Sequence, residues 1–196
     1  MEGGFSLGKH RTLDRDKVLV AAREIVRTSG FRSLTFQSLA KALDIRSQSL
    51  YNYYRNLDDV IESLGTELMD RLYQELIEQL PGVSGRQALS IYAKTAHDYF
   101  DQEGPLVEVI YYVHNYPETS PFVKATGRVL DILRRLVRDI PLKHMDHGAY
   151  VQAFISSVLG FTVLEIMGFL PEEQPGRSNS FQELLDLHLG EIQATS

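Results

Sequence analysis

TFQSLAKALDIRSQSLYNYY, residues 35–54, is the stretch that decides the fold. Its apolar residues recur at the spacing of two short helices, with Leu39 and Leu43 on one face of the first. Thr35 is a good N-cap residue for that helix. Asp44 falls between the two helices, and aspartate tolerates left-handed backbone better than most residues with a side chain. The pattern is typical of a helix-turn-helix, in which the second helix lies in the major groove of DNA.

The outward side chains of this segment suit DNA recognition. Arginine matches guanine edges, glutamine and asparagine match adenine edges, and hydroxyl groups bind phosphates. A solvated polar face on a small bundle is the alternative interpretation. The residues that we predict to contact DNA are Thr35, Gln37, Arg46, Ser47, Gln48, Ser49, Tyr51, Asn52, Tyr53 and Arg55.

Charge is distributed unevenly along the 196 residues. The net charge of −6 argues against a polyanion partner. Residues 1–55, however, hold ten Lys and Arg against five Asp and Glu, whereas residues 56–196 hold ten against 21. A basic N-terminal part on an acidic body favours binding of a polyanion at one end only.

The rest of the sequence indicates an all-α protein of about nine helices, because helical periodicity recurs between Gly and Pro breaks. Cysteine is absent, which excludes disulfides and thiolate metal sites. The start of the chain lacks the apolar core of a signal peptide. Polar residues interrupt the most apolar stretch, residues 149–170, so we expect a cytoplasmic protein without a membrane partner.

Helix boundaries follow from capping signals. We expect helices over residues 14–29 and from Asn56, a cap, to about residue 80. The sequence 84–87 fits a capping box that opens a helix. Gly104-Pro105 should open the next, and Ser120-Pro121 the one that ends near residue 140. Helices over about 144–169 and 180–192 complete the chain.

Residues 18–61 resemble the DNA-binding domain of the TetR family of bacterial regulators. The family pattern is an apolar helix ending in Gly-aromatic, then Thr-x-x-x-Leu-Ala-x-x-Leu-Gly-Val, and, after a few variable residues, Leu-Tyr-x-His-Phe. Here the matching residues are Gly30-Phe31, Thr35, Leu39-Ala40, Leu43-Asp44-Ile45 and Leu50-Tyr51-Asn52-Tyr53-Tyr54.

Four positions depart from the family pattern. Asp44 replaces the turn glycine, and Tyr53 replaces the histidine. Arg46 replaces a frequent capping serine, so we expect Ser47 or Asp44 to cap instead. Leu57 replaces a lysine that binds phosphate in relatives, and we expect Arg55 to take that role.

The resemblance implies a homodimeric repressor that a small-molecule ligand releases from a palindromic operator. It also implies three parts: a basic arm (1–11), a DNA-binding domain (12–56) and a regulatory and dimerisation domain (57–196). Lys9, His10 and Arg11 would either reach DNA or form a disordered tail. An activator of the same fold, or a helical small-molecule-binding protein without DNA binding, are the alternatives.

The helix over residues 144–169 is apolar nearly all round, so it must be covered on both sides. A second copy can supply that cover in an isologous four-helix interface with the last helix, as in relatives. The residues that we predict at this interface are Ser156, Gly160, Phe181, Leu185 and His188.

Aromatic residues on several helices predict a cavity for a flat or lipophilic effector. The alternative is an ordinary core whose tyrosine hydroxyls are satisfied locally. The predicted pocket residues are Tyr92, Thr95, Tyr99, Val109, Tyr112, Phe122, Thr126, Phe154, Val158 and Phe161.

Other polar residues suggest structural roles. Glu165 is expected to pair with an Arg or His. His144 and His147 lie three residues apart, but a surface capping cluster is favoured over a metal site. Neither a catalytic constellation nor a phosphate-binding loop stands out, so we expect neither an enzyme nor a resident cofactor or metal.

Overall fold

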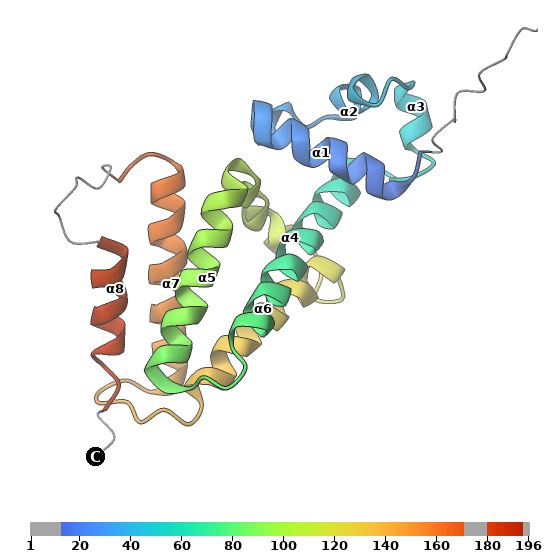
Figure 1. The fold of residues 1–196 in the computed structure, drawn as a ribbon. Coiled ribbons are helices and arrows are strands. Elements are labelled where there is room, and N and C mark those ends of the chain that lie inside the picture. Colours follow the sequence, from blue (N-terminus) through green and yellow to red (C-terminus); the bar gives the residue numbers. More distant parts are fainter. Residues whose placement is uncertain (1–12, 171–179, 194–196) are drawn as a thin grey trace, which may run out of the picture. The chain divides into compact units, whose positions relative to one another are not determined.

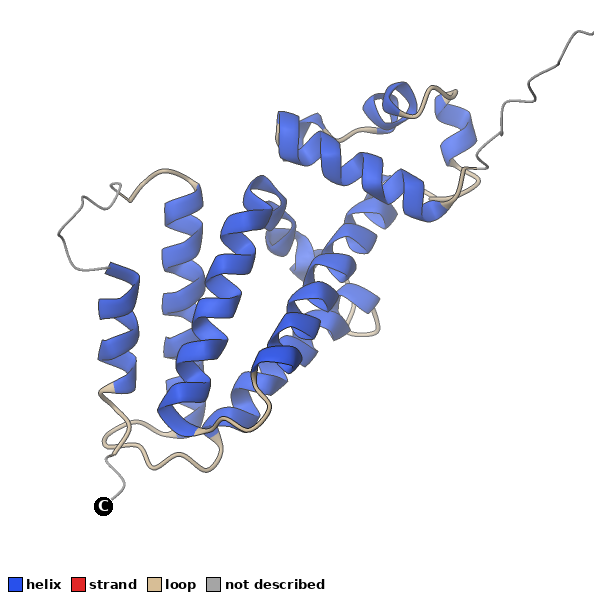
Figure 2. Ribbon diagram, viewed as in Figure 1, coloured by secondary structure: helices blue, strands red, loops and turns tan. Residues whose placement is uncertain are grey.

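The computed structural model describes residues 13–170 and 180–193, in which helices are joined by loops (Figure 2). They form eight α-helices and two 3-10 segments, which confirms the predicted all-α class. The chain divides into two compact units, the first ending at Val60 and the second starting at Ile61. The basic arm of residues 1–11 lies outside the described residues.

The first unit contains α1 (Arg15–Ser29), η1 (Phe31–Ser33), α2 (Phe36–Ala42), α3 (Ser47–Leu50) and the start of α4 (Leu57–Gln79). Local sequence explains the boundaries of these helices. The Asp14 carboxylate accepts a hydrogen bond from the Lys17 N–H at 2.8 Å and so caps α1. Gly30 ends α1 with a φ of 79°, and Thr35 caps α2 through reciprocal bonds with Ser38. The core of the unit consists of Val18, Ala22, Val26, Phe31, Leu34, Leu39, Ala40, Leu50 and Tyr54.

The second unit is built around α5 (Gly85–Glu103). This helix contacts η2, α6, α7 and α8, and α7 in turn contacts α6 and α8 (Figure 1). The bounds of these elements are η2 Gly104–Asn115, α6 Pro121–Val137, α7 His147–Ile166 and α8 Ser180–Leu189.

Several sequence predictions of helix starts are confirmed. The Asn56 side chain accepts from the Asp59 N–H at 2.9 Å, and the Ser120 hydroxyl accepts from the Phe122 N–H at 3.1 Å. Asp146 caps α7, so this helix begins three residues later than expected. Each of these side chains satisfies an N–H group that the first helical turn leaves unpaired.

Two predicted helix starts lie at the expected residues, but the capping bond predicted at the first is absent and the second opens a 3-10 helix. Ser84 precedes α5 but makes no capping hydrogen bond, because Gly85 takes a φ of 58° and departs from helical geometry directly after it. Gly104-Pro105 does open a helical segment, but η2 is wound as a 3-10 helix. Gly104 has a φ of 55° and proline lacks an N–H group, so an α-helix cannot simply continue there.

Within the second unit, α4 and α6 meet at Gly65, where the ring of Phe122 lies directly against the helix backbone. A Cβ atom on Gly65 would lie 2.5 Å from that ring. Phe122 is fully buried, so its ring has no room to move aside.

We predict that Gly65→Ala lowers the free energy of unfolding by about 1–3 kcal/mol, the usual cost of overpacking a core. Urea unfolding followed by circular dichroism measures the change. Gly127→Ala is the matched control, because Gly127 lies within α6 and a Cβ there meets nothing within 4 Å. This control should gain up to about 1 kcal/mol from helix propensity. Equal effects of the two changes would contradict the role of Gly65.

Candidate nucleic-acid interface and regulatory core

The turn between α2 and α3 depends on Asp44, whose φ is 53°. This residue is the single non-glycine position with a positive φ among the described residues. The left-handed conformation lets the Ile45 N–H donate to the Ala40 carbonyl at 3.0 Å, which closes the end of α2. Ala40 and Leu50 are buried at this junction, and of the apolar face predicted for α2, Leu39 is buried and Leu43 is half-buried.

Helix α3 starts at Ser47, with Arg46 as its N-cap residue. Neither Ser47 nor Asp44 is the N-cap residue, so that prediction is wrong. Arg46 makes no side-chain capping bond, and its backbone is extended with φ −77° and ψ 141°. The Arg46 side chain is therefore exposed at the tip of the helix and available to a ligand.

Predicted DNA-contacting residues form one outward row on α3 and the turn that follows it. Tyr51 is 61% exposed, and its ring meets Phe36 edge-on at 5.1 Å, which fixes its orientation. Gln37 on α2 is exposed too, whereas the Thr35 hydroxyl is engaged in capping. Exposed members of the row are Arg46, Ser47, Gln48, Tyr51 and Asn52, and half-buried members are Ser49 and Tyr53.

Arg55, the expected substitute for the missing phosphate-binding lysine, is paired with Asp59. Its Nε donates to Oδ2 at 2.8 Å, and one terminal nitrogen donates to Oδ1 at 3.0 Å. These hydrogen bonds hold the pKa of the Asp59 carboxyl below its usual range, and the charge of Arg15 adds to the effect. The Arg55 side chain nevertheless remains 85% exposed.

Arg15 is a candidate DNA-contacting residue that the sequence prediction missed. Its guanidinium lies over the Tyr54 ring, 4.3 Å from the centroid, and the Tyr54 hydroxyl donates to the Arg15 carbonyl at 3.3 Å. Tyr54 was recognised in the sequence as a motif aromatic, but nothing in the sequence links it to a residue 39 positions earlier.

Many of the predicted pocket residues form the core of the second unit. The hydroxyl of Tyr92 donates to the Val129 carbonyl at 3.2 Å, and that of Tyr99 to the Leu68 carbonyl at 2.9 Å. Burial raises the pKa of Tyr92 well above its usual value. Fully or almost fully buried positions are Tyr92, Tyr99, Val109, Phe122, Phe154 and Val158, and half-buried positions are Thr95, Tyr112, Thr126 and Phe161.

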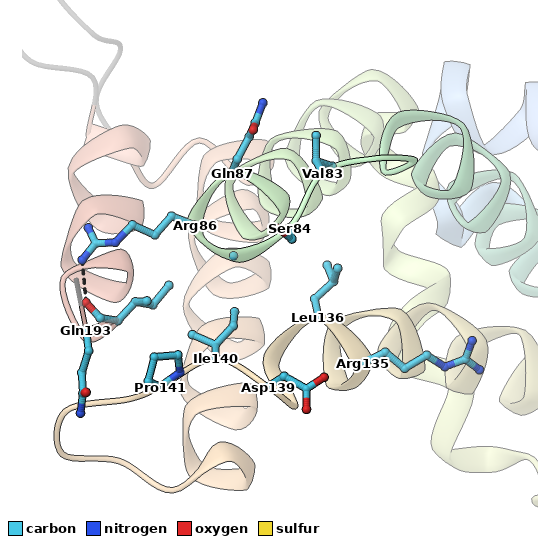
Figure 3. A pocket seen from close by; sticks show the side chains of 12 residues that line it. Val83, Ser84, Arg86, Gln87, Arg135, Leu136, Asp139, Ile140, Pro141 and Gln193 are labelled. Carbon is cyan, nitrogen blue, oxygen red and sulfur yellow. Dashed lines mark hydrogen bonds between the residues drawn. The ribbon is translucent and has the colours of Figure 1, made fainter. Parts of the chain in front are cut away.

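A cavity of about 660 Å³ lies at the start of α5, where the end of α6 and the segment after α8 also meet (Figure 3). Arg86 donates to the Ile192 carbonyl at 2.6 Å on one side of it. In Figure 3 the side chain of Arg135 extends away from Arg86, so the charged groups do not converge on one point. None of the predicted pocket residues lines this cavity.

A second cavity, of about 420 Å³, lies between η2 and α7 and is lined mainly by apolar residues. Ser156 and Gly160, two of the predicted interface residues, form part of its wall. By contrast, Phe181 and Leu185 of α8 are buried within the second unit itself. His188 is half-buried beside Phe154, and burial lowers its pKa.

Among the residues that the structure describes, those that contact helix α7 cover it on one side only. Tyr150, Phe154, Val158 and Thr162 are buried at every fourth position. Across its most apolar window only 22% is buried, and by length and composition alone this helix could cross a membrane. Large apolar side chains that remain exposed on and after α7, and on α8, are Leu164, Met167, Phe169 and Leu187.

Three histidines of the second unit, His97, His144 and His147, are held by separate partners. Glu165 binds His97, with Nε2 and Oε2 2.7 Å apart, which confirms the expected Arg or His partner, although the Glu165 side chain is 40% exposed. The His144 ring contacts Glu191, and the ring of His147 bonds to the Ile140 carbonyl at 3.0 Å. The two rings therefore serve different structural contacts.

Comparison with known proteins shows the same architecture. No protein-family model matches the chain. The regulator UidR of Escherichia coli K12, an HTH-type transcriptional regulator, is 23% identical over 93% of this chain and 94% of its own length. The TetR family regulator PfmR of Thermus thermophilus superposes with a TM-score of 0.69 at 17% identity, over 94% of this chain and 100% of PfmR.

Two further structural neighbours carry ligands. BioQ, solved with its double-stranded DNA operator, has a TM-score of 0.65 at 22% identity, over 91% of this chain and 97% of BioQ. FadR of Bacillus subtilis, solved with stearoyl-CoA, has a TM-score of 0.66 at 14% identity, over 91% of this chain and 99% of FadR. The chain therefore has the fold of TetR family regulators, as the sequence motifs predicted.

We predict that Asp44→Val lowers the free energy of unfolding by about 1–2 kcal/mol, because a β-branched residue strains a left-handed position. Asp44→Gly should change it by less than about 0.5 kcal/mol, because relief of strain is offset by greater freedom of the unfolded chain. Thermal unfolding of both variants measures this. Lys41→Val, within α2, is the control and should cost less. If glycine and valine behaved alike, the turn would not depend on backbone conformation.

Proposed function

We propose that this chain is a TetR-type transcriptional regulator, a homodimeric repressor that a small-molecule effector releases from a palindromic DNA operator. The observation that carries the proposal is the exposed polar row on α3, held at the end of α2 by the left-handed Asp44. Residues 12–56 would bind DNA, residues 1–11 would extend that surface, and residues 57–196 would hold the effector and the partner subunit.

The composition of the exposed row suits sequence reading in the major groove. Arg46 at the tip of α3 and Gln48 two residues later can bond to guanine and adenine edges. Ser47, Tyr51 and Asn52 carry groups that bind phosphates or further base edges. Resemblance to BioQ, which was solved with its operator, supports the assignment. A cytoplasmic location and the absence of enzymatic activity accompany this function.

Dimerisation follows from the uncovered surface of α7. An apolar helix that its own chain covers on one side needs a second surface. An isologous contact between two copies would supply that surface, and the two α3 helices of such a dimer would bind successive major grooves about one helical turn apart. Ser156 and Gly160 would allow close approach, while His188 of α8 would lie near the edge of the contact.

The effector would bind among the aromatic residues of the second unit. Tyr92, Tyr99, Phe122 and Phe154 provide an apolar aromatic environment suited to a flat or lipophilic molecule. FadR of Bacillus subtilis, a structural neighbour, was solved with stearoyl-CoA, which supports an apolar effector class. An activator with the same DNA contacts is the second candidate function. A repressor and an activator differ in how the effector changes transcription.

Selection from a randomised duplex library tests DNA binding directly. Wild-type protein should enrich a palindromic sequence, and no enrichment at low salt would contradict the proposal. We predict that Arg46→Ala and Gln48→Ala each reduce the preference for the selected operator by about 1–3 kcal/mol, because each removes a base contact. Fluorescence anisotropy with operator and scrambled duplexes measures the preference.

Arg71→Ala and Gln74→Ala serve as matched controls for these two changes. Both residues are exposed on α4 in the second unit and should leave operator preference unaltered. Retention of full preference by the Arg46 and Gln48 double variant would show that other residues read the operator.

We predict that Gly160→Arg converts the dimer into a folded monomer, because a long charged side chain would stand in the apolar contact surface. Sedimentation equilibrium measures the mass, and circular dichroism checks the fold. Gly127→Arg on α6 is the matched control, since a side chain there enters open space. A Gly160→Arg protein that remained dimeric would place the contact elsewhere.

A further inference from the structure

Two arginines from distant parts of the chain are held by neighbouring residues of the first unit, Arg15 by Tyr54 and Arg55 by Asp59. Arg15 is the first residue of α1, and Arg55 lies two residues before α4. Asp59, on the first turn of α4, binds Arg55 and lies close enough to Arg15 for its charge to act on the carboxylate. The cluster thus combines two positive charges with one negative charge.

Asp59 fixes the orientation of Arg55. Its carboxylate accepts two side-chain bonds from Arg55, at 2.8 and 3.0 Å, and a third bond from the Arg55 backbone N–H at 3.0 Å. A bidentate pair of this kind holds the planar guanidinium in one plane. The Asp59 side chain is 15% exposed and that of Arg55 is 85% exposed, so the anchor is inside and the cation faces solvent.

Tyr54 fixes Arg15 in a similar way. The Tyr54 ring is 2% exposed and therefore rigid, and the Arg15 guanidinium lies 4.3 Å from its centroid. The hydroxyl of Tyr54 also donates to the Arg15 carbonyl, which ties the start of α1 to the ring. Stacking on an aromatic face and pairing with a carboxylate both restrict a side chain that otherwise loses much entropy when it binds a ligand.

The cluster lies within reach of the groove-reading segment. Arg55 follows exposed Asn52 by three residues, so their Cα atoms are at most about 11 Å apart. That is comparable with the width of about 12 Å of the major groove, whose edges are the phosphate backbones. Two fixed, solvent-facing guanidiniums beside a groove-reading helix match the geometry of phosphate oxygens.

We propose that Arg15 and Arg55, positioned by Tyr54 and Asp59, form a phosphate-binding clamp that grips the operator backbone beside the groove read by α3. The clamp rests on the proposed DNA-binding function and adds two things to it. It assigns a DNA contact to Arg15, and it makes Asp59 a positioning residue that strengthens binding to a polyanion despite its negative charge.

The Asp59→Asn variant distinguishes positioning from plain electrostatics, because the two predict opposite changes in DNA affinity. The change adds one unit of positive charge, so electrostatics alone would tighten DNA binding. The clamp requires the opposite: loss of the bidentate pair should weaken operator binding by roughly threefold to tenfold, which lies in the lower part of the range of energetic couplings between neighbours. Asp58→Asn is the matched control, with the same charge change one residue away and no expected weakening.

The salt dependence of binding tests the two arginines. Arg15→Gln and Arg55→Gln should each reduce the slope of log affinity against log salt by about 0.9, and should weaken operator and random duplexes alike. In an Arg55→Gln background, Asp59→Asn should no longer weaken binding, because only its effect on charge remains. Anisotropy titrations between about 50 and 300 mM salt give these slopes, and thermal unfolding confirms that each variant is folded.

Different experimental results would overturn the clamp and the proposed DNA-binding function on which it rests. Tighter binding by Asp59→Asn, or unchanged slopes for both arginine variants, overturns the clamp while operator binding by the wild type stands. Should Asp59→Asn fail to fold, two other measurements test the clamp. These are the affinity of Tyr54→Phe for the operator, since this variant lacks the hydroxyl that binds the Arg15 carbonyl, and the salt slopes of the two arginine variants. A wild-type protein that enriches no duplex at all overturns the proposed function itself.

Discussion

The left-handed backbone at Asp44 is the constraint on which the candidate DNA-binding surface depends. With a φ of 53° it reverses the chain after α2 and lets Leu50 of α3 enter the same core as Leu39. With Leu50 buried, Ser47 and Gln48 of this four-residue helix face outward, and Ser49 is half-buried. Arg46, Gln48 and Asn52 are therefore exposed because Leu50 is buried and because the turn at Asp44 orients α3.

At the start of α4, the same residues make structural contacts and take part in the proposed DNA contacts. Asn56 satisfies the helix N-terminus, which leaves the Asp59 carboxylate to bind Arg55 rather than to cap the helix alone. The charge of Arg15 also lowers the pKa of this carboxyl, and the Arg15 guanidinium lies over the ring of buried Tyr54. This sharing has a physical advantage, because a rigid anchor reduces the entropy lost on binding.

Sequence reasoning located most of the described helices, because capping residues and apolar periodicity are local signals. Asp14, Thr35 and Ser120 cap their helices through bonds that span two or three residues. It also placed the starts at Ser84 and Gly104, but it predicted neither the missing capping bond nor the 3-10 winding, which accompany a positive φ at Gly85 and at Gly104. It identified the exposed row on α3 as well, since one buried leucine fixes which side chains of a short helix point outward.

By itself, the sequence determined the all-α class, the helix-turn-helix and the resemblance to TetR family regulators, since each depends on residues close together in the chain. Only the tertiary structure decided which distant residues meet: Arg15 with Tyr54, His97 with Glu165, and Phe122 with Gly65. It also showed that Leu164 of α7, and Met167 and Phe169 just after this helix, are exposed. Such contacts depend on how helices pack in three dimensions, and periodicity along one helix specifies its apolar face but not its neighbour.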